Sequence, residues 1–110
     1  MDKGYIIVTT LDSPEYDFPK HYITIADTLE TAIKEVENMV EGQKHIEGDS
    51  VKSVERFGRE CDVLWEKARV WCNNGLGNLN GPVLYGYEVV TSFLNHESVT
   101  YRCVYEVDRH

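Results

Sequence analysis

The sequence predicts an α+β fold in which a four-stranded, mainly antiparallel sheet carries two helices on one face. Three observations lead to this prediction. Short β-branched segments lie near both ends of the 110-residue chain, and the middle of the chain has apolar residues at helical spacing. Turns that contain glycine or proline separate these segments. The expected order of elements is β-β-α-α-β-β, in a single domain that covers residues 1–110.

The first two strands are predicted at residues 5–11 and 21–26. Both segments are rich in β-branched and aromatic residues. The connection between them, residues 12–20, carries two prolines and three acids. Such a composition favours a loop, and the second strand is therefore expected to run antiparallel to the first.

The first helix is predicted to begin at Asp27. Its side chain can accept a hydrogen bond from the backbone N–H of Glu30, and the Glu30 side chain can return one, as in a capping box. Apolar residues then recur at helical spacing along one face as far as Val40. Gly42 is expected to end the helix.

A second, longer helix is predicted from Asp49 or Ser50 to Asn73 or Asn74. Its apolar residues recur in steps of three and four, which is typical of a helix with one buried seam: Val54, Phe57, Cys61, Leu64, Ala68 and Trp71. The segment Gly75–Pro82 is expected to cap this helix and turn the chain. A phosphate-binding loop would instead lie between a strand and the start of a helix.

Two further strands, residues 83–94 and 98–107, are predicted to form a hairpin around residues 95–97. In the last strand the side chains alternate, so one face is expected to be covered and the other to face water. The covered face would carry Val99, Tyr101, Cys103, Tyr105 and Val107, and the wet face Thr100, Arg102 and Glu106, with Val104 as the exception.

The chain is acidic, with a formal net charge of −8 at pH 7. Residues 1–50 hold eleven acids and four bases, whereas residues 51–110 hold eight acids and seven bases. Such a surface repels nucleic acid and anionic membranes, so direct binding to either is not expected. No apolar run approaches the roughly 20 residues of a membrane-spanning helix. The absence of a recognisable signal peptide and the three scattered cysteines favour reduced thiols and a cytoplasmic location.

No catalytic residue, cofactor or metal site is predicted. The four histidines have no partner at metal-ligand spacing, and the cysteines are expected to fill apolar space. No nucleophile and base are spaced for catalysis, so an enzyme ranks third among the classes considered.

The favoured function is a small binding module, an inhibitor or adaptor that presents an acidic surface to a protein partner. This partner is expected to be basic, for example a nucleic-acid-binding protein whose ligand the acidic surface would mimic. The residues predicted to form the acidic surface are Asp12, Glu15, Asp17, Glu30, Glu37 and Glu41.

One sector of the second predicted helix indicates self-association. At about 100° per residue, cations and valines share a sector that contains no acid, and the residues assigned to it are Lys52, Arg56, Arg59, Val63 and Val70. A homodimer would bury the valines and bring the cations to the acidic half of a second copy. The other interpretation is that the sheet curls around the helix and covers both sides within a monomer.

The alternative function is small-ligand binding. Tyrosines of the last two strands and asparagines of the glycine-rich segment would then line a pocket: Tyr85, Tyr87, Tyr101, Tyr105, Asn78 and Asn80. The dependence of binding affinity on ionic strength distinguishes the two functions. Salt screening weakens binding at an acidic interface but hardly affects the binding of a ligand in an aromatic pocket.

Overall fold

The fold was analysed in a computed structural model of the chain. The structure describes residues 3–14, 17–18, 20–45, 50–56, 77–94 and 96–109.

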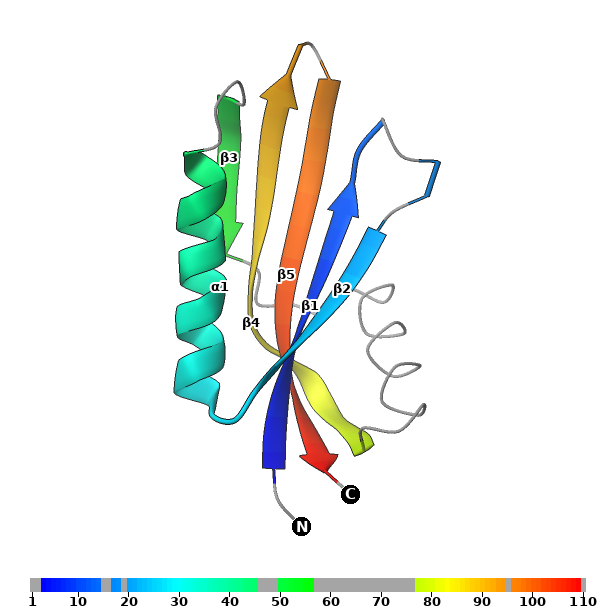
Figure 1. The fold of residues 1–110 in the computed structure, drawn as a ribbon, viewed down its shortest axis with the longest axis vertical. Coiled ribbons are helices and arrows are strands. Elements are labelled where there is room, and N and C mark those ends of the chain that lie inside the picture. The colour runs from blue at the N-terminus through cyan, green and yellow to red at the C-terminus, as the bar shows by residue number, and fades with distance from the viewer. Residues whose placement is uncertain are drawn as a thin grey trace.

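The described residues form one five-stranded sheet and one helix (Figure 1). The elements, in chain order, are β1 (Lys3–Asp12), β2 (Lys20–Ala26), α1 (Leu29–Lys44), β3 (Ser50–Arg56), β4 (Gly77–Phe93) and β5 (His96–Arg109). The strands lie in the order β2-β1-β5-β4-β3, and every neighbouring pair is antiparallel. The α+β class with an antiparallel sheet is confirmed, but the prediction of four strands and two helices is wrong.

Strand β1 is an interior strand of the sheet and pairs with both β2 and β5. Ile7 is opposite Thr24 of β2 on one side and opposite Val104 of β5 on the other. Ile6, Ile7 and Val8 are all fully buried although successive strand residues point to opposite faces. Consecutive buried residues of this kind are typical of a strand that is covered on both faces.

Helix α1 begins at Leu29, two residues after Asp27, and ends at Lys44, two residues after Gly42. Thr28, in an extended conformation, is the N-cap, and its hydroxyl accepts a hydrogen bond from the backbone N–H of Thr31 at 3.1 Å. Threonine is a good N-cap, so Asp27 is not needed in that role. Gly42 does not end the helix, which continues to Lys44 and is capped by His45.

The predicted second helix is wrong over residues 50–56, which form the edge strand β3. Its register with β4 shifts between Val51 and Ser53, so that Val51 is opposite Thr91 and Val54 is opposite Val89. This irregularity places two valines three residues apart on the same face, where both pack against the core under α1. The helix was predicted from a seam that starts at Val54, and Val54 is the one member of that seam among the described residues. The rest of the predicted helix lies outside the described residues.

Strand β4 begins at Gly77 and therefore includes most of the segment that was predicted to be a loop, Gly75–Pro82. Its pairing with β5 is irregular between Asn80 and Tyr85, a stretch that contains Pro82. Proline within a sheet is tolerated at such irregularities because no ladder hydrogen bond is required of it there. The predicted hairpin is confirmed, with Leu94 at a positive φ of 48° in the turn.

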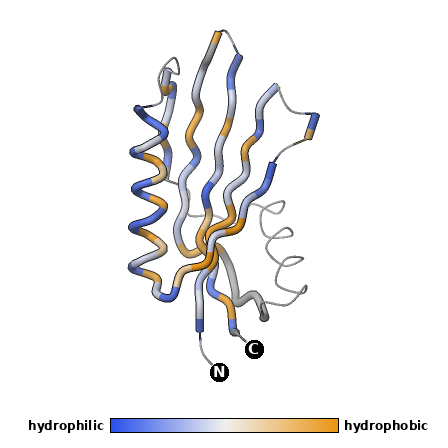
Figure 2. Tube along the Cα trace, viewed as in Figure 1, coloured by the Kyte–Doolittle hydropathy of each residue, from blue (hydrophilic) through white to orange (hydrophobic). Residues whose placement is uncertain are grey.

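Both faces of the central strands are buried, which corrects the predicted division of β5 into a covered and a wet face. Cys103, Tyr105 and Val107 are fully buried, as expected, but so is Val104 on the other face, and Thr100 is only 3% exposed. Helix α1 packs on the Val104 face through Ala32, Val36 and Val40. Figure 2 shows hydrophobic stretches gathered where the strands overlap in this view.

Candidate functional site

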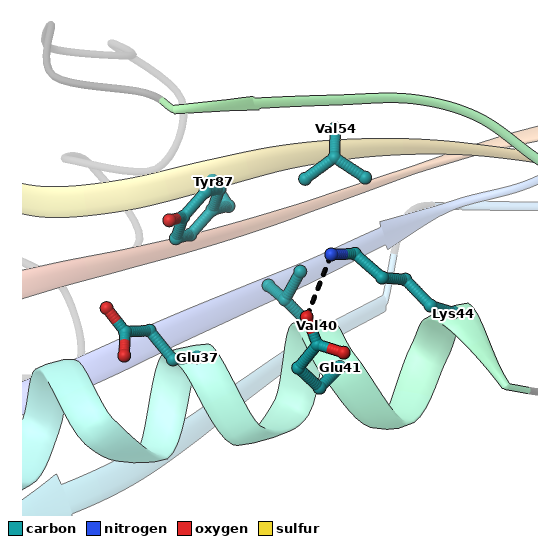
Figure 3. A pocket seen from close by; sticks show the side chains of 6 residues that line it. All are labelled: Glu37, Val40, Glu41, Lys44, Val54 and Tyr87. Atoms are coloured by element: carbon teal, nitrogen blue, oxygen red, sulfur yellow. Dashed lines mark hydrogen bonds and ion pairs between the residues drawn. The ribbon is translucent and has the colours of Figure 1, made fainter.

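A pocket of about 200 Å³ lies between α1 and the β3–β4 edge of the sheet (Figure 3). Helix α1 contributes one side of the pocket, and the strands contribute Val54 and Tyr87. The residues that line it are Glu37, Val40, Glu41, Lys44, Val54 and Tyr87. The helical ones are three and four residues apart, which places them on one side of α1.

The pocket has an apolar interior and a charged rim. Val40 is buried and Val54 and Tyr87 are half-buried, whereas Glu37, Glu41 and Lys44 are exposed. Val54 and Tyr87 come to the same face because Val54 is opposite Val89, two residues along β4 from Tyr87. The pocket therefore combines aliphatic, aromatic and ionic groups within reach of solvent.

Tyr85 holds the Glu37 carboxylate in place at this pocket, and Tyr87 is hydrogen-bonded to Tyr85. The buried hydroxyl of Tyr85 donates a hydrogen bond of 2.8 Å to Oε1 of Glu37 and lies 3.2 Å from the hydroxyl of Tyr87. Because the single proton of Tyr85 goes to the carboxylate, Tyr87 must donate in the second bond. The two rings pack edge to face, with centroids 5.5 Å apart and an interplanar angle of 81°.

The environment of Tyr85 keeps its phenol neutral. Burial raises the pKa of Tyr85 well above its ordinary value of 10.0, and the hydrogen bonds with Tyr87 and Glu37 raise this pKa further. A neutral phenol remains a hydrogen-bond donor, so the bond to Glu37 persists throughout the physiological pH range.

The second carboxylate of the pocket, Glu41, already has a counter-charge. Lys44 donates to Oε1 of Glu41 at 2.9 Å, and Nε2 of His45 lies 3.9 Å from Oε2. The hydrogen bond from Lys44 lowers the pKa of Glu41. Glu37, in contrast, forms no ion pair within the described part of the chain. The two acids at the rim therefore differ in their remaining ability to bind a cation.

Next to the pocket, Arg102 is largely buried under α1. Its Nη2 lies 3.4 Å from Oε1 of Gln43, and Nε2 of Gln43 donates to the Thr100 hydroxyl at 2.9 Å. The Nε and Nη1 atoms of Arg102 are buried without a hydrogen-bond partner. Burial lowers the pKa of this guanidinium. The sequence pattern placed Arg102 on a wet face, and nothing in it indicated the contact with Gln43.

The structure divides the predicted acidic surface into two parts. Glu30, Glu37 and Glu41 are exposed on α1 and, at about 100° per residue, fall within a sector of about 40°. We call these three residues the acidic stripe. Asp12 ends β1 and Asp17 lies in the β1–β2 connection, which Figure 1 shows on the opposite side of the molecule from α1. Glu15 lies outside the described residues.

Only part of the predicted self-association surface can be located. Lys52 and Arg56 belong to β3 and not to a helix. The Lys52 ammonium forms an exposed ion pair of 2.7 Å with Glu97 of β5. Arg59, Val63 and Val70 lie outside the described residues, so self-association remains a prediction.

The tyrosines of the alternative ligand pocket lie on two different faces of the sheet. Tyr85 and Tyr87 face α1, whereas Tyr101 and Tyr105 belong to the opposite face of β5. Asn78 and Asn80 lie in the first part of β4, opposite Asp108 and Glu106. Among these six residues, the observed pocket includes only Tyr87.

The described residues contain neither a cluster of metal ligands nor a helix that could span a membrane. No group of three or more His, Cys, Asp and Glu residues is arranged to hold a metal ion. No described helix has the length and apolar character needed to cross a membrane. Of the cysteines, Cys103 is described, and it is buried.

Comparison of the chain with family models, curated proteins and solved structures found no significant match.

Proposed function

We propose that this chain is a protein-binding module that presents the acidic stripe of α1 to a basic partner. The observation that carries this proposal is the narrow sector occupied by Glu30, Glu37 and Glu41, all exposed on one helix. Ala32, Val36 and Val40 pack that helix on the core, so the backbone positions of the three glutamates are fixed relative to the sheet. A helix that is already ordered loses little backbone entropy when a partner binds.

The chemistry of the stripe points to a cationic protein as the partner. Carboxylates attract lysine and arginine side chains and repel phosphates, so a nucleic-acid-binding protein fits better than nucleic acid itself. Occupation of such a partner's cationic surface would make this chain an inhibitor or adaptor. A cytoplasmic location belongs to the same proposal, since it rests on the expectation of reduced thiols.

Binding of an oligolysine peptide to the full chain tests the proposal. We expect fluorescence anisotropy to show an affinity that falls steeply as ionic strength rises from about 0.05 to 0.3 M. Glu30→Gln/Glu37→Gln should weaken binding at least about threefold. Asp12→Asn/Asp17→Asn removes the same charge elsewhere and should have a smaller effect. Equal losses in the two variants would show attraction to overall charge and contradict the proposal.

Small-ligand binding is the second candidate, and the pocket itself is the observation that favours it. Its volume of about 200 Å³ is below the roughly 300–1,000 Å³ typical of sites for drug-sized ligands. A ligand held by Val40, Val54 and Tyr87 would bind with little dependence on salt. A salt-independent metabolite recovered with the purified protein would favour this candidate over the acidic stripe.

A further inference from the structure

We propose that the pocket between α1 and the β3–β4 edge is a socket for one lysine or arginine side chain of the partner. This inference rests on the proposed function and makes it more specific. It names the pocket as the place where the basic partner is anchored, and it names Glu37 as the group that recognises the cation. The socket is defined by the pocket and the groups that line it, not by the number of acids near it.

The Glu37 carboxylate is oriented but has no counter-charge among the residues that the structure describes. Tyr85 fixes one of its oxygens with a hydrogen bond of 2.8 Å, yet a phenol is neutral and leaves the negative charge in place. No described cation lies within ion-pair distance of Glu37. At the same rim, Lys44 neutralises Glu41 at 2.9 Å. The charged groups of the pocket thus sum to one uncompensated negative charge, located on Glu37.

The remaining walls suit the stem of a long cationic side chain. Val40 and Val54 offer aliphatic surface, against which the methylene groups of lysine or arginine can pack while the charged end reaches the rim. Tyr87 adds an aromatic ring, and cations are attracted to the faces of such rings. An anionic side chain would meet Glu37 and be repelled.

The size and position of the pocket also favour a side chain over a free metabolite. A volume of about 200 Å³ is many times the ~10–15 Å³ that one water molecule needs, but it falls short of a typical ligand site. Glu37 and Glu41 belong to both the pocket and the acidic stripe. A partner lying along the stripe would therefore bring its own side chains to the mouth of the pocket.

The test uses two probes with the full chain. The first is Nα-acetyl-lysine N-methylamide, with the norleucine analogue as the uncharged control, followed by ¹H–¹⁵N NMR. We expect saturable shifts at the amides of Val40, Val54 and Tyr87 with a dissociation constant of about 1 mM for the lysine probe. The norleucine probe should bind about tenfold more weakly, because it lacks the charge-assisted bond to Glu37. Equal shifts from the two probes would overturn the socket, since the pocket would then be a simple apolar site.

Glu37→Gln and Glu30→Gln form the matched pair of variants. Both remove one charge from the acidic stripe, and glutamine at position 37 can still accept the hydrogen bond from Tyr85, so the fold should persist. We expect Glu37→Gln to weaken the lysine probe about tenfold and Glu30→Gln to weaken it less than about threefold. Equal thermal midpoints of the variants and the wild type verify folding. An unchanged affinity of folded Glu37→Gln would overturn the inference.

The oligolysine peptide is the second probe, and it separates failure of the socket from failure of the proposed function. Salt-dependent binding of this peptide that Glu37→Gln and Glu30→Gln weaken equally would leave the acidic stripe as the interface but exclude the socket. Binding of the lysine probe without binding of oligolysine would exclude the protein partner, and with it the socket as proposed. A greater loss for Glu37→Gln with both probes supports the inference.

Discussion

The hydroxyl of Tyr85 donates a hydrogen bond of 2.8 Å to the carboxylate of Glu37, a residue 48 positions earlier in the chain. This bond connects the long strand β4 to the exposed side of α1. It also fixes the position of the one carboxylate in the pocket that has no cationic neighbour among the described residues. A buried phenol therefore determines how a surface charge is presented.

The first prediction concerns the strength of this bond. Tyr85→Phe keeps the ring in the core but removes the donor, and the exposed Glu37 can turn to water. We expect the free energy of unfolding to fall by about 1 kcal/mol in a urea titration. Tyr22→Phe, at a residue that is 52% exposed, is the control and should change stability by less than about 0.5 kcal/mol. Equal effects of the two changes would show that the bond contributes nothing.

The second prediction is a loss of stability in alkaline solution. Burial raises the pKa of Tyr85 in the folded chain above its ordinary value of 10.0. The unfolded chain therefore releases this proton first, so the contribution of Tyr85 is complete below about pH 10 and is lost as pH rises beyond it. Urea titrations at about pH 8 and about pH 11 should show a smaller alkaline loss for Tyr85→Phe than for the wild type. Parallel losses in the two proteins would contradict the pKa direction.

The sequence predicted elements whose periodicity matches their tertiary environment. Residues 5–11, 21–26 and 98–107 are β-branched or alternating, and they form strands with the expected antiparallel pairing. Helix α1 has one apolar face and one core to contact. In these elements the local pattern and the global packing agree, which makes prediction from a single sequence possible.

Prediction failed where a local irregularity changed the period. The helix was predicted from a seam that starts at Val54. In the structure, the shift of register between Val51 and Ser53 brings Val51 and Val54 to one face, so the three-residue spacing of these valines does not reveal the strand. The assignment of faces in β5 failed for a different reason. Val104 is buried under α1 while Cys103 and Tyr105 are buried on the other side, so no alternation marks a single covered face.

The sequence indicated individual residues of the candidate site but not that they lie together. Glu37 and Glu41 were assigned to an acidic surface and Tyr87 to an aromatic pocket, and only the packing of α1 beside β3 and β4 brings them together. Arg102 was expected to face water because it alternates with the residues assigned to the covered face of the last strand. Its position under Gln43 depends on how far α1 extends past Gly42, a property of tertiary packing.

The third prediction is that Arg102 lowers the stability of the fold. Two of its nitrogen atoms are buried without a partner, and its bond to Gln43 is long at 3.4 Å. Methionine fills a similar space without a charge, so Arg102→Met should leave the free energy of unfolding unchanged or raise it by about 1 kcal/mol. Lys3→Met changes an exposed cation and serves as the control. A loss of about 3 kcal/mol or more for Arg102→Met would reveal a counter-charge for this guanidinium.

The last prediction tests the burial of the sheet face opposite α1. Ile6 and Ile25 are opposite each other on β1 and β2 and point to that same face, yet Ile6 is fully buried while Ile25 is 48% exposed. Deletion of a buried isoleucine side chain costs the transfer of its methyl and methylene groups and leaves a cavity.

Ile6→Ala should therefore lower the free energy of unfolding by about 2–5 kcal/mol. Ile25→Ala removes the same atoms from a half-exposed edge and should cost less than about 1 kcal/mol. Guanidinium titrations of the two variants provide the comparison, and the slope of each transition verifies that the extent of unfolding is unchanged. A small and equal loss for both variants would mean that this face of the sheet is open to water. In that case only the α1 face would hold the core.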